Sequence, residues 1–220
     1  MIRLFDFPKN SFFGKVIPKS KFYEYGNISS KQRDLFVTQV EEIIWKYKLA
    51  PETINLPATS AVPEIQIFEI KAKADGVEDE VLRCIDKAIP YPIVFEVLSG
   101  DRIKMIAAFK RRHDANSEHW IQSEYYDSGW CQVDSERSPL HFSLNLGSVY
   151  EQILVSLSPN AARQGECLSD LFNRNEQIKK KTRQLELIKN KLKLEKQFNR
   201  KVELNAVLKQ VNVELTSLLA

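Results

Sequence analysis

The chain has 220 residues, 43% hydrophobic and 28% charged, which is typical of a soluble globular protein with one domain and an extension, or two small domains. Its three cysteines, Cys84, Cys131 and Cys167, are odd in number and widely spaced, so we expect free thiols in a reducing compartment and no disulfide framework. No apolar run approaches the about 20 residues needed to cross a bilayer. The first ten residues do not resemble a signal peptide, so a cytoplasmic protein without a membrane partner is expected.

The net charge of +3 conceals an uneven distribution along the chain. Residues 174–205 hold eleven lysines and arginines against four glutamates, a net charge of +7 that leaves −4 for the remainder. An acidic body joined to a basic arm is therefore predicted.

Two helices are predicted near the N-terminus. Pro18 suits the first position of a short helix that ends at Gly26. Ser29 or Ser30 can cap a second helix, predicted over residues 31–48. The apolar residues of this second helix recur at the spacing of one buried stripe: Phe36, Val40, Ile43, Ile44 and Tyr47.

The centre of the fold is predicted to be a strand–helix–strand unit. A strand over residues 64–73 is apolar on both faces, which indicates a central strand covered on both sides. An amphipathic helix over 78–89 follows, and a second strand over 93–98 comes after it. Because the connection contains a helix, the two strands should be parallel, with a right-handed crossover.

Two further strands complete the predicted sheet. A turn at residues 99–101 returns the chain into a strand over 102–110, and a polar loop leads to an edge strand over 119–126. The expected fold class is α+β, with an α/β core built on a small mixed four-stranded sheet and flanking helices. Pro90 and Pro92 could each be cis or trans.

The C-terminal part is predicted to be helical. A helix over residues 146–157 ends the globular domain, which we assign to 1–160, and the segment 168–219 contains neither proline nor glycine. Its apolar heptads keep one register before residues 195–201 and another after them. We expect a long helical arm of coiled-coil type, either one helix of about 75 Å or a helical pair.

The strongest catalytic candidate is Glu69-Ile70-Lys71. Nucleases of the PD-(D/E)xK type place an acid and a lysine two residues apart, so that both side chains emerge on one face of a strand beside Mg²⁺. They also need an acid on a preceding strand. Glu52 lies in a proline-rich connection and Glu64 faces away on the same strand, so the motif is incomplete and its residues have a simpler interpretation as solvated strand-end charges.

No metal or cofactor site is predicted. His113, Asp114, His119 and Cys131 lack the short, repeated spacing of zinc ligands. The sequence contains no phosphate-binding glycine loop and no nucleophile elbow, so no cofactor is expected.

Two groups of cations could contact DNA. Those in the globular domain adjoin aromatic residues that could stack on bases, and those in the arm could follow a phosphate backbone. Sheet packing for the aromatic residues and a solvated helix face for the arm are the alternative interpretations. The candidate DNA-contacting residues are Lys110, Arg111, Arg112, Lys196, Arg200 and Lys201.

Three stretches of the chain carry a family resemblance: residues 44–55 (IWKYKLAPETIN), 84–92 (CIDKAIPYP) and 195–205 (EKQFNRKVELN). Together they resemble the bacterial family catalogued as domain of unknown function 4391, over nearly the whole chain. The resemblance implies no catalytic residues, and it counts against the nuclease because similar sequences do not keep a lysine at the position of Lys71. It also implies a gene beside DNA methyltransferase and helicase genes in restriction-like anti-phage clusters.

We therefore expect a non-catalytic accessory protein of a bacterial anti-phage defence or restriction-modification system. Its partner would be a helicase or DNA methyltransferase of the same gene cluster, or a second copy of the chain. A DNA-binding module and a PD-(D/E)xK-like nuclease are the alternatives. The residues expected to contact a partner are Leu185, Ile188, Leu192, Phe198, Asn199, Val202, Leu204, Leu208 and Val211.

Overall fold

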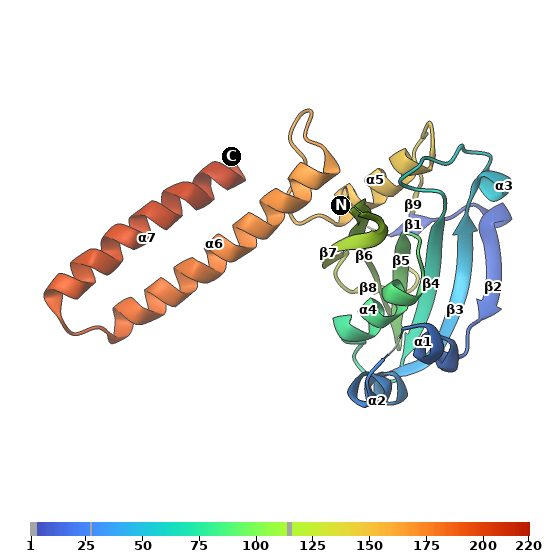
Figure 1. Ribbon diagram of the computed structural model, residues 1–220, viewed down its shortest axis with the longest axis horizontal. Helices are drawn as coiled ribbons and strands as arrows, with labels where there is room; N and C mark the ends of the chain where they lie inside the picture. The colour runs from blue at the N-terminus through green and yellow to red at the C-terminus, as the bar shows by residue number, and fades with distance from the viewer. Residues whose placement is uncertain (1–3, 27, 114–115) are drawn as a thin grey trace. The chain divides into compact units, whose positions relative to one another are not determined.

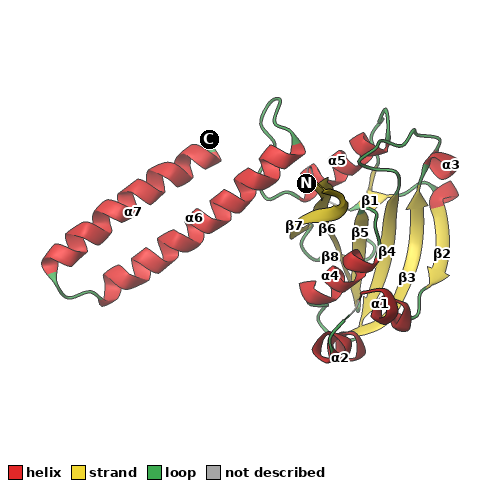
Figure 2. Cartoon of the chain, in the orientation of Figure 1, coloured by secondary structure: helices red, strands yellow, loops and turns green. Residues whose placement is uncertain are grey.

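The computed structural model of the chain describes residues 4–26, 28–113 and 116–220, without the side chains of 112–119. The chain divides into two compact units, Met1–Ser158 and Pro159–Ala220. The first unit contains a sheet with helices, and the second consists mainly of two long helices (Figures 1 and 2).

The first unit is built on a seven-stranded, mostly antiparallel sheet, so the predicted α+β class is confirmed but the count of four strands is wrong. Its order is β2-β3-β4-β5-β6-β7, and β8 also pairs with β6. Within the described part of this sheet, β4 and β5 are the one parallel pair, as the crossover through a helix predicts. The strands are β2 (Phe12–Val16), β3 (Val40–Leu49), β4 (Ile65–Ala72), β5 (Ile93–Ser99), β6 (Arg102–His113), β7 (Asn116–Asp127) and β8 (Cys131–Gln132).

The helix predicted over residues 31–48 is correct for the first half of this stretch and wrong for the second half, which is a strand. Helix α2 covers Ser30–Gln39 and begins at a capping box in which the Ser29 hydroxyl accepts a hydrogen bond from the Gln32 amide. From Val40 the chain becomes strand β3, antiparallel to β4. A run rich in β-branched and aromatic residues fits a helix stripe and a strand equally well, and here pairing with the apolar strand β4 decides the outcome.

The polar loop expected at residues 111–118 is also mostly strand. Strand β6 continues to His113 and β7 begins at Asn116, with irregularities in their register. Within the described residues β7 lies at the edge of the sheet, as predicted.

Helices α1 (Lys19–Gly26), α2 and α4 (Asp79–Ala88) cover one face of the sheet (Figure 1). Their core side chains meet those of β4, β5 and β6 in one cluster that includes Phe36, Phe68, Leu82, Ile85 and Phe95. The apolar stripe predicted for the α4 region is therefore confirmed. The peptide bonds before Pro90 and Pro92, which end α4, are both trans.

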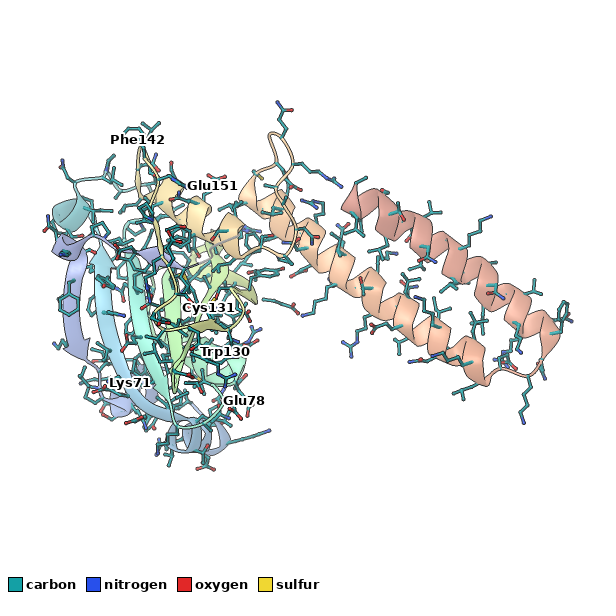
Figure 3. All side chains as sticks on the ribbon, turned by 180° about the vertical axis from the view of Figure 1, so that it is seen from behind. Lys71, Glu78, Trp130, Cys131, Phe142 and Glu151 are labelled. Carbon is teal, nitrogen blue, oxygen red and sulfur yellow. The ribbon has the colours of Figure 1, made fainter. Side chains whose placement is uncertain are left out.

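The opposite face of the sheet is covered partly by loop. The segment between Cys131 and Phe142 runs along this side (Figure 3). Within it, β9 (Ser138–Pro139) pairs in parallel with β1 (Phe5–Asp6), close to the short helix η1 (Lys9–Ser11) in sequence. Helix α3 (Pro51–Ile54) is short, and α5 (Leu146–Leu157) has the predicted bounds.

The second unit is a helical hairpin. Helix α6 (Leu168–Leu194) and helix α7 (Phe198–Leu219) pack side by side and are joined by a turn at residues 195–197 (Figure 2). The predicted break in heptad phase is therefore this turn. No helix in the described part of the chain combines the length and apolar character needed to cross a membrane.

Candidate functional site

Six of the nine residues predicted to contact a partner instead contact one another inside the hairpin. Leu185, Ile188 and Val211 are buried between α6 and α7, and Leu192, Leu204 and Leu208 pack against them with Leu215. Because the hairpin covers these side chains itself, they stabilise the unit and are not the surface that it offers to another molecule.

The other three, Phe198, Asn199 and Val202, lie exposed at the turn. Phe198 is 78% exposed and the preceding Leu194 is 82% exposed. Four exposed cations are close to these apolar side chains in sequence: Lys193, Lys196, Arg200 and Lys201. We call residues 193–202 the hairpin tip. Large apolar side chains exposed together among cations are unusual on a protein that acts alone.

The turn of the hairpin is fixed by the acid within the tip, Glu195. Its Oε1 accepts hydrogen bonds from the backbone amides of Lys196 and Gln197, at 2.8 and 2.9 Å. These backbone bonds lower the pKa of Glu195. A carboxylate at the N-terminus of α7 also suits the helix dipole, so this acid holds the shape of the turn.

The other end of the hairpin is tied by two arginines. Arg174 forms a two-pronged ion pair with Glu166, with both N–O distances 2.7 Å, and also donates to the Ala161 carbonyl. Arg163 donates to the last carbonyls of α7, at Ser217 and Leu218. The bond from Arg174 lowers the pKa of Glu166 to about 2.

A second group of charged residues lies on the loop-covered face of the sheet. The Lys46 ammonium lies 2.7 Å from Glu69 and 2.8 Å from Glu96, which face each other across the parallel pair β4–β5. Glu96 is fully buried and also accepts from Arg137. Burial opposes the charge on Lys46, but the Glu96 and Glu69 carboxylates outweigh it and raise the pKa of Lys46. The arrangement is an alternating array of acids and bases.

The preceding strand that the nuclease motif requires is present, which corrects the sequence analysis. Strand β3 places Glu42 opposite Lys71, with a distance of 2.6 Å between carboxylate and ammonium. The acid facing the motif is therefore Glu42, and neither Glu52 nor Glu64 has this role. The bond to Glu42 raises the pKa of Lys71. Figure 3 labels Lys71 on this side of the sheet.

The residues that the structure describes do not combine three or more His, Cys, Asp or Glu side chains in a group able to hold a metal ion. In this structure Lys46 occupies the space between the two carboxylates of β4 and β5. The sets considered for zinc and for DNA include His113, Asp114, His119 and Arg112, whose side chains lie outside the described part.

Lys110, predicted to contact DNA, is only 5% exposed. Its ammonium donates to the Asp86 carbonyl at 2.6 Å and to the Ile89 and Tyr91 carbonyls, so it caps the end of α4. The Asp86 carboxylate lies 3.6 Å from the same ammonium and accepts from Gln122. A phosphate backbone cannot reach an ammonium enclosed in this way, so the DNA role predicted for Lys110 is wrong.

The other predicted DNA contacts have different environments. Arg111 is half-buried and has interaction partners of its own. Lys196, Arg200 and Lys201 are exposed in the hairpin tip, where Arg200 lies 3.8 Å from Glu195.

Sequence reasoning missed Lys46, Glu96, Arg137 and Asp86. A usable signal existed for Glu96, a single acid inside the apolar run IVFEVLS, because an acid in a central strand must find a cation. Lys46 lies within the stretch 31–48 that was predicted to be a helix, and Arg137 comes from a segment with no regular pattern. Their meeting depends on tertiary structure.

A comparison with known families identifies the chain. The family model described as a domain of unknown function, DUF4391, matches residues 5–215. The chain belongs to this family. The match spans both units of the DUF4391 protein, and its hairpin is therefore part of the family domain. No curated protein and no solved structure matches the chain.

Proposed function

We propose that this DUF4391 protein is a non-catalytic accessory protein whose hairpin tip docks onto an acidic protein partner. The supporting observation is the exposure of Leu194, Phe198 and Val202 in a ten-residue tip that also carries four exposed cations. Such an apolar patch with a charged rim has the anatomy of an interface core. The partner class suggested by the family resemblance is a helicase or DNA methyltransferase of an anti-phage or restriction-modification system.

A second copy of the chain suits the tip less well than a different, acidic protein. Residues 174–205 carry a net charge of +7, and two copies brought together there would repel each other. A partner with an acidic rim around an apolar groove would instead match both the charge and the apolar side chains.

The proposal is tested by purifying the tagged full chain from its native host and identifying the proteins that copurify. Phe198→Ser combined with Val202→Ser should lose a specific partner that the wild type retains. Leu187→Ser combined with Val213→Ser is the matched control, because these apolar residues are also exposed on α6 and α7 but lie outside the tip. Equal recovery with both variants would contradict the proposal.

Direct DNA binding by the tip and docking onto a protein differ in the substitutions that should weaken binding. If the tip bound DNA, then Lys196→Gln with Lys201→Gln would reduce a salt-dependent gel shift, while Phe198→Ser would change it little. If the tip docks onto a protein, Phe198→Ser should weaken partner binding more than Lys196→Gln with Lys201→Gln does, because a buried aromatic residue usually dominates an interface.

A PD-(D/E)xK-like nuclease is the second candidate, favoured by one specific observation. Glu42 on β3 faces Lys71 on β4, with Glu69 two residues away on the same strand. This candidate expects plasmid nicking that depends on Mg²⁺ or Mn²⁺ and disappears in Lys71→Met but not in the neighbouring, exposed Lys73→Met. Absence of metal-dependent nicking by the wild type would remove it.

A further inference from the structure

A shallow groove of about 580 Å³ runs along helix α7 in the second unit. Among the residues that the structure describes, those lining it all belong to α7 and recur three, four and seven positions apart, so they form one stripe along the helix. Leu208 borders both this stripe and the hairpin core, so the two are continuous. We call the stripe the α7 face; its exposed members include Asn205, Lys209, Asn212, Val213, Thr216 and Ala220.

The α7 face carries almost no charge, unlike the rest of the hairpin. Residues 204–220 contain two charged residues, Lys209 and Glu214, whereas the equally long segment 177–193 of α6 contains eight. Glu214 pairs with Lys181 of α6, which leaves Lys209 as the one charged residue among the described lining of the α7 face. A helix side that faces water is normally rich in charged residues, as α6 is. The α7 face therefore has the composition of a surface that another helix covers.

The partner that suits an uncharged helix face is another uncharged helix face. An acidic protein, which would match the hairpin tip, has little charge to recognise on the α7 face. The same face of a second copy has matching chemistry, because Ala220 lets two helices approach closely and the exposed Val213 gains an apolar contact. The amides of Asn205 and Asn212, seven residues apart, can hydrogen-bond across such a pair and fix its register. Pairing of one face with its own copy about a two-fold axis is the commonest way in which identical chains assemble.

Charge also favours one direction for the second copy. Residues 174–205 carry a net charge of +7, so parallel α7 helices would place two basic segments side by side. In an antiparallel pair centred between Asn212 and Val213, Asn205 of one copy lies beside Ala220 of the other. The two copies of Phe198 are then about 43 Å apart along the helix axis, which is several Debye lengths at physiological salt. The antiparallel arrangement therefore avoids the repulsion that disfavours self-association through the tip.

We propose that the chain forms a symmetric dimer through the α7 face, with the two α7 helices antiparallel and the two hairpin tips at opposite ends. The two hairpins together form a four-helix bundle. This dimer does not rest on the docking function proposed for the tip. Each tip binds by itself in this arrangement, so a variant that separates the copies leaves the dissociation constant per tip unchanged.

Sedimentation velocity of the full chain, from micromolar to submillimolar concentration, tests the dimer. The contact is about 24 Å long and smaller than a standard interface, so we expect micromolar affinity and a mass that rises from 25.5 kDa towards twice that value. Asn212→Lys places like charges across the two-fold axis and should weaken the dimer at least about tenfold. Gln210→Lys makes the same change of amide to ammonium on the opposite side of α7 and should have no effect. A wild type that stays monomeric, or equal effects of the two variants, would overturn the proposal.

Single cysteines test the direction of the two helices. In a chain with Cys131→Ser and Cys167→Ser, Asn212→Cys lies close to the two-fold axis and should be joined to its own copy by a short bis-maleimide. Ala220→Cys should not be joined in this way, because antiparallel pairing places the two copies of residue 220 about 22 Å apart along the axis. Crosslinking of Ala220→Cys as readily as Asn212→Cys would contradict the antiparallel dimer.

Discussion

Lys110 has the sequence context of a surface cation, followed by two arginines, yet it lies inside the first unit. Burial lowers the pKa of Lys110 and raises that of Asp86, because it disfavours the charged form of each group. The fold must therefore supply polar partners that offset the lost hydration. It does so with the carbonyls at the end of α4 and with hydrogen bonds from Gln122 and Tyr125 to the Asp86 carboxylate. The network stabilises the stretch 84–92 that carries part of the family resemblance.

Removing this ammonium should be costly. Lys110→Met leaves the Asp86 carboxylate and the end of α4 without their partner, and breaking a buried ion pair typically costs about 3–5 kcal/mol. Urea unfolding of the full chain measures the loss. Lys104→Met is the control, because Lys104 pairs with the partly exposed Asp127. Losing this pair should lower the free energy of unfolding by less than about 1 kcal/mol. Equal losses would contradict the assigned role of Lys110.

Glu166 gives a prediction about pH. Its pKa in the folded chain, about 2, lies below the value expected when the chain is unfolded, because Arg174 stabilises the carboxylate. The stabilisation is therefore complete above the unfolded pKa and is lost as the pH falls towards about 2. At pH 6 the wild type should have a higher Tm of thermal unfolding than Glu166→Gln, and this difference in Tm should close by pH 2. A difference in Tm that does not change with pH would contradict the ion pair.

At the scale of elements, the sequence predicted most of what depends on local pattern. The amphipathic helix α5 has the predicted bounds, and the crossover unit β4–α4–β5 has the predicted direction. The segment 30–49 was misassigned because its apolar spacing fits two structures, and the choice depends on pairing with β4. The array around Glu96 could not be predicted, because its members come from three strands and a loop.

The C-terminal helices show a related limit. A turn without glycine or proline leaves no composition signal, and only the break in heptad phase marked its place. The hairpin brings Lys181 of α6 against Glu214 of α7, where the two side chains form an ion pair. In a continuous helix these residues would lie about 50 Å apart.

This difference permits a direct test of the hairpin. Lys181→Cys and Glu214→Cys, in a chain with Cys131→Ser and Cys167→Ser, should be joined within one molecule by a short bis-maleimide at low protein concentration. Lys181→Cys with Arg200→Cys is the control. Arg200 lies near the turn, about 21 Å along α7 from Glu214, the residue that pairs with Lys181, so these two cysteines should react poorly. Crosslinks formed only between molecules would contradict the hairpin.

At the scale of the whole molecule, charge and exposed apolar surface are distributed unequally. The first unit holds some charged groups in internal networks, as Glu96 and Lys110 show, and the second unit leaves cations and large apolar side chains exposed at its tip. The sequence predicted that functional residues lie in the C-terminal part. It could not separate Phe198 and Val202 from the leucines that the hairpin buries, since that distinction requires the turn.

The central claim is that the hairpin tip docks onto a protein, and calorimetric titration of the copurified partner with the full chain tests it most directly. Phe198→Ser should raise the dissociation constant by at least about thirtyfold, which is the loss of affinity expected for an aromatic hot spot. Val213→Ser, an exposed apolar residue of α7 outside the tip, should bind as the wild type does. An unchanged dissociation constant for Phe198→Ser, with the partner bound normally, would contradict the account.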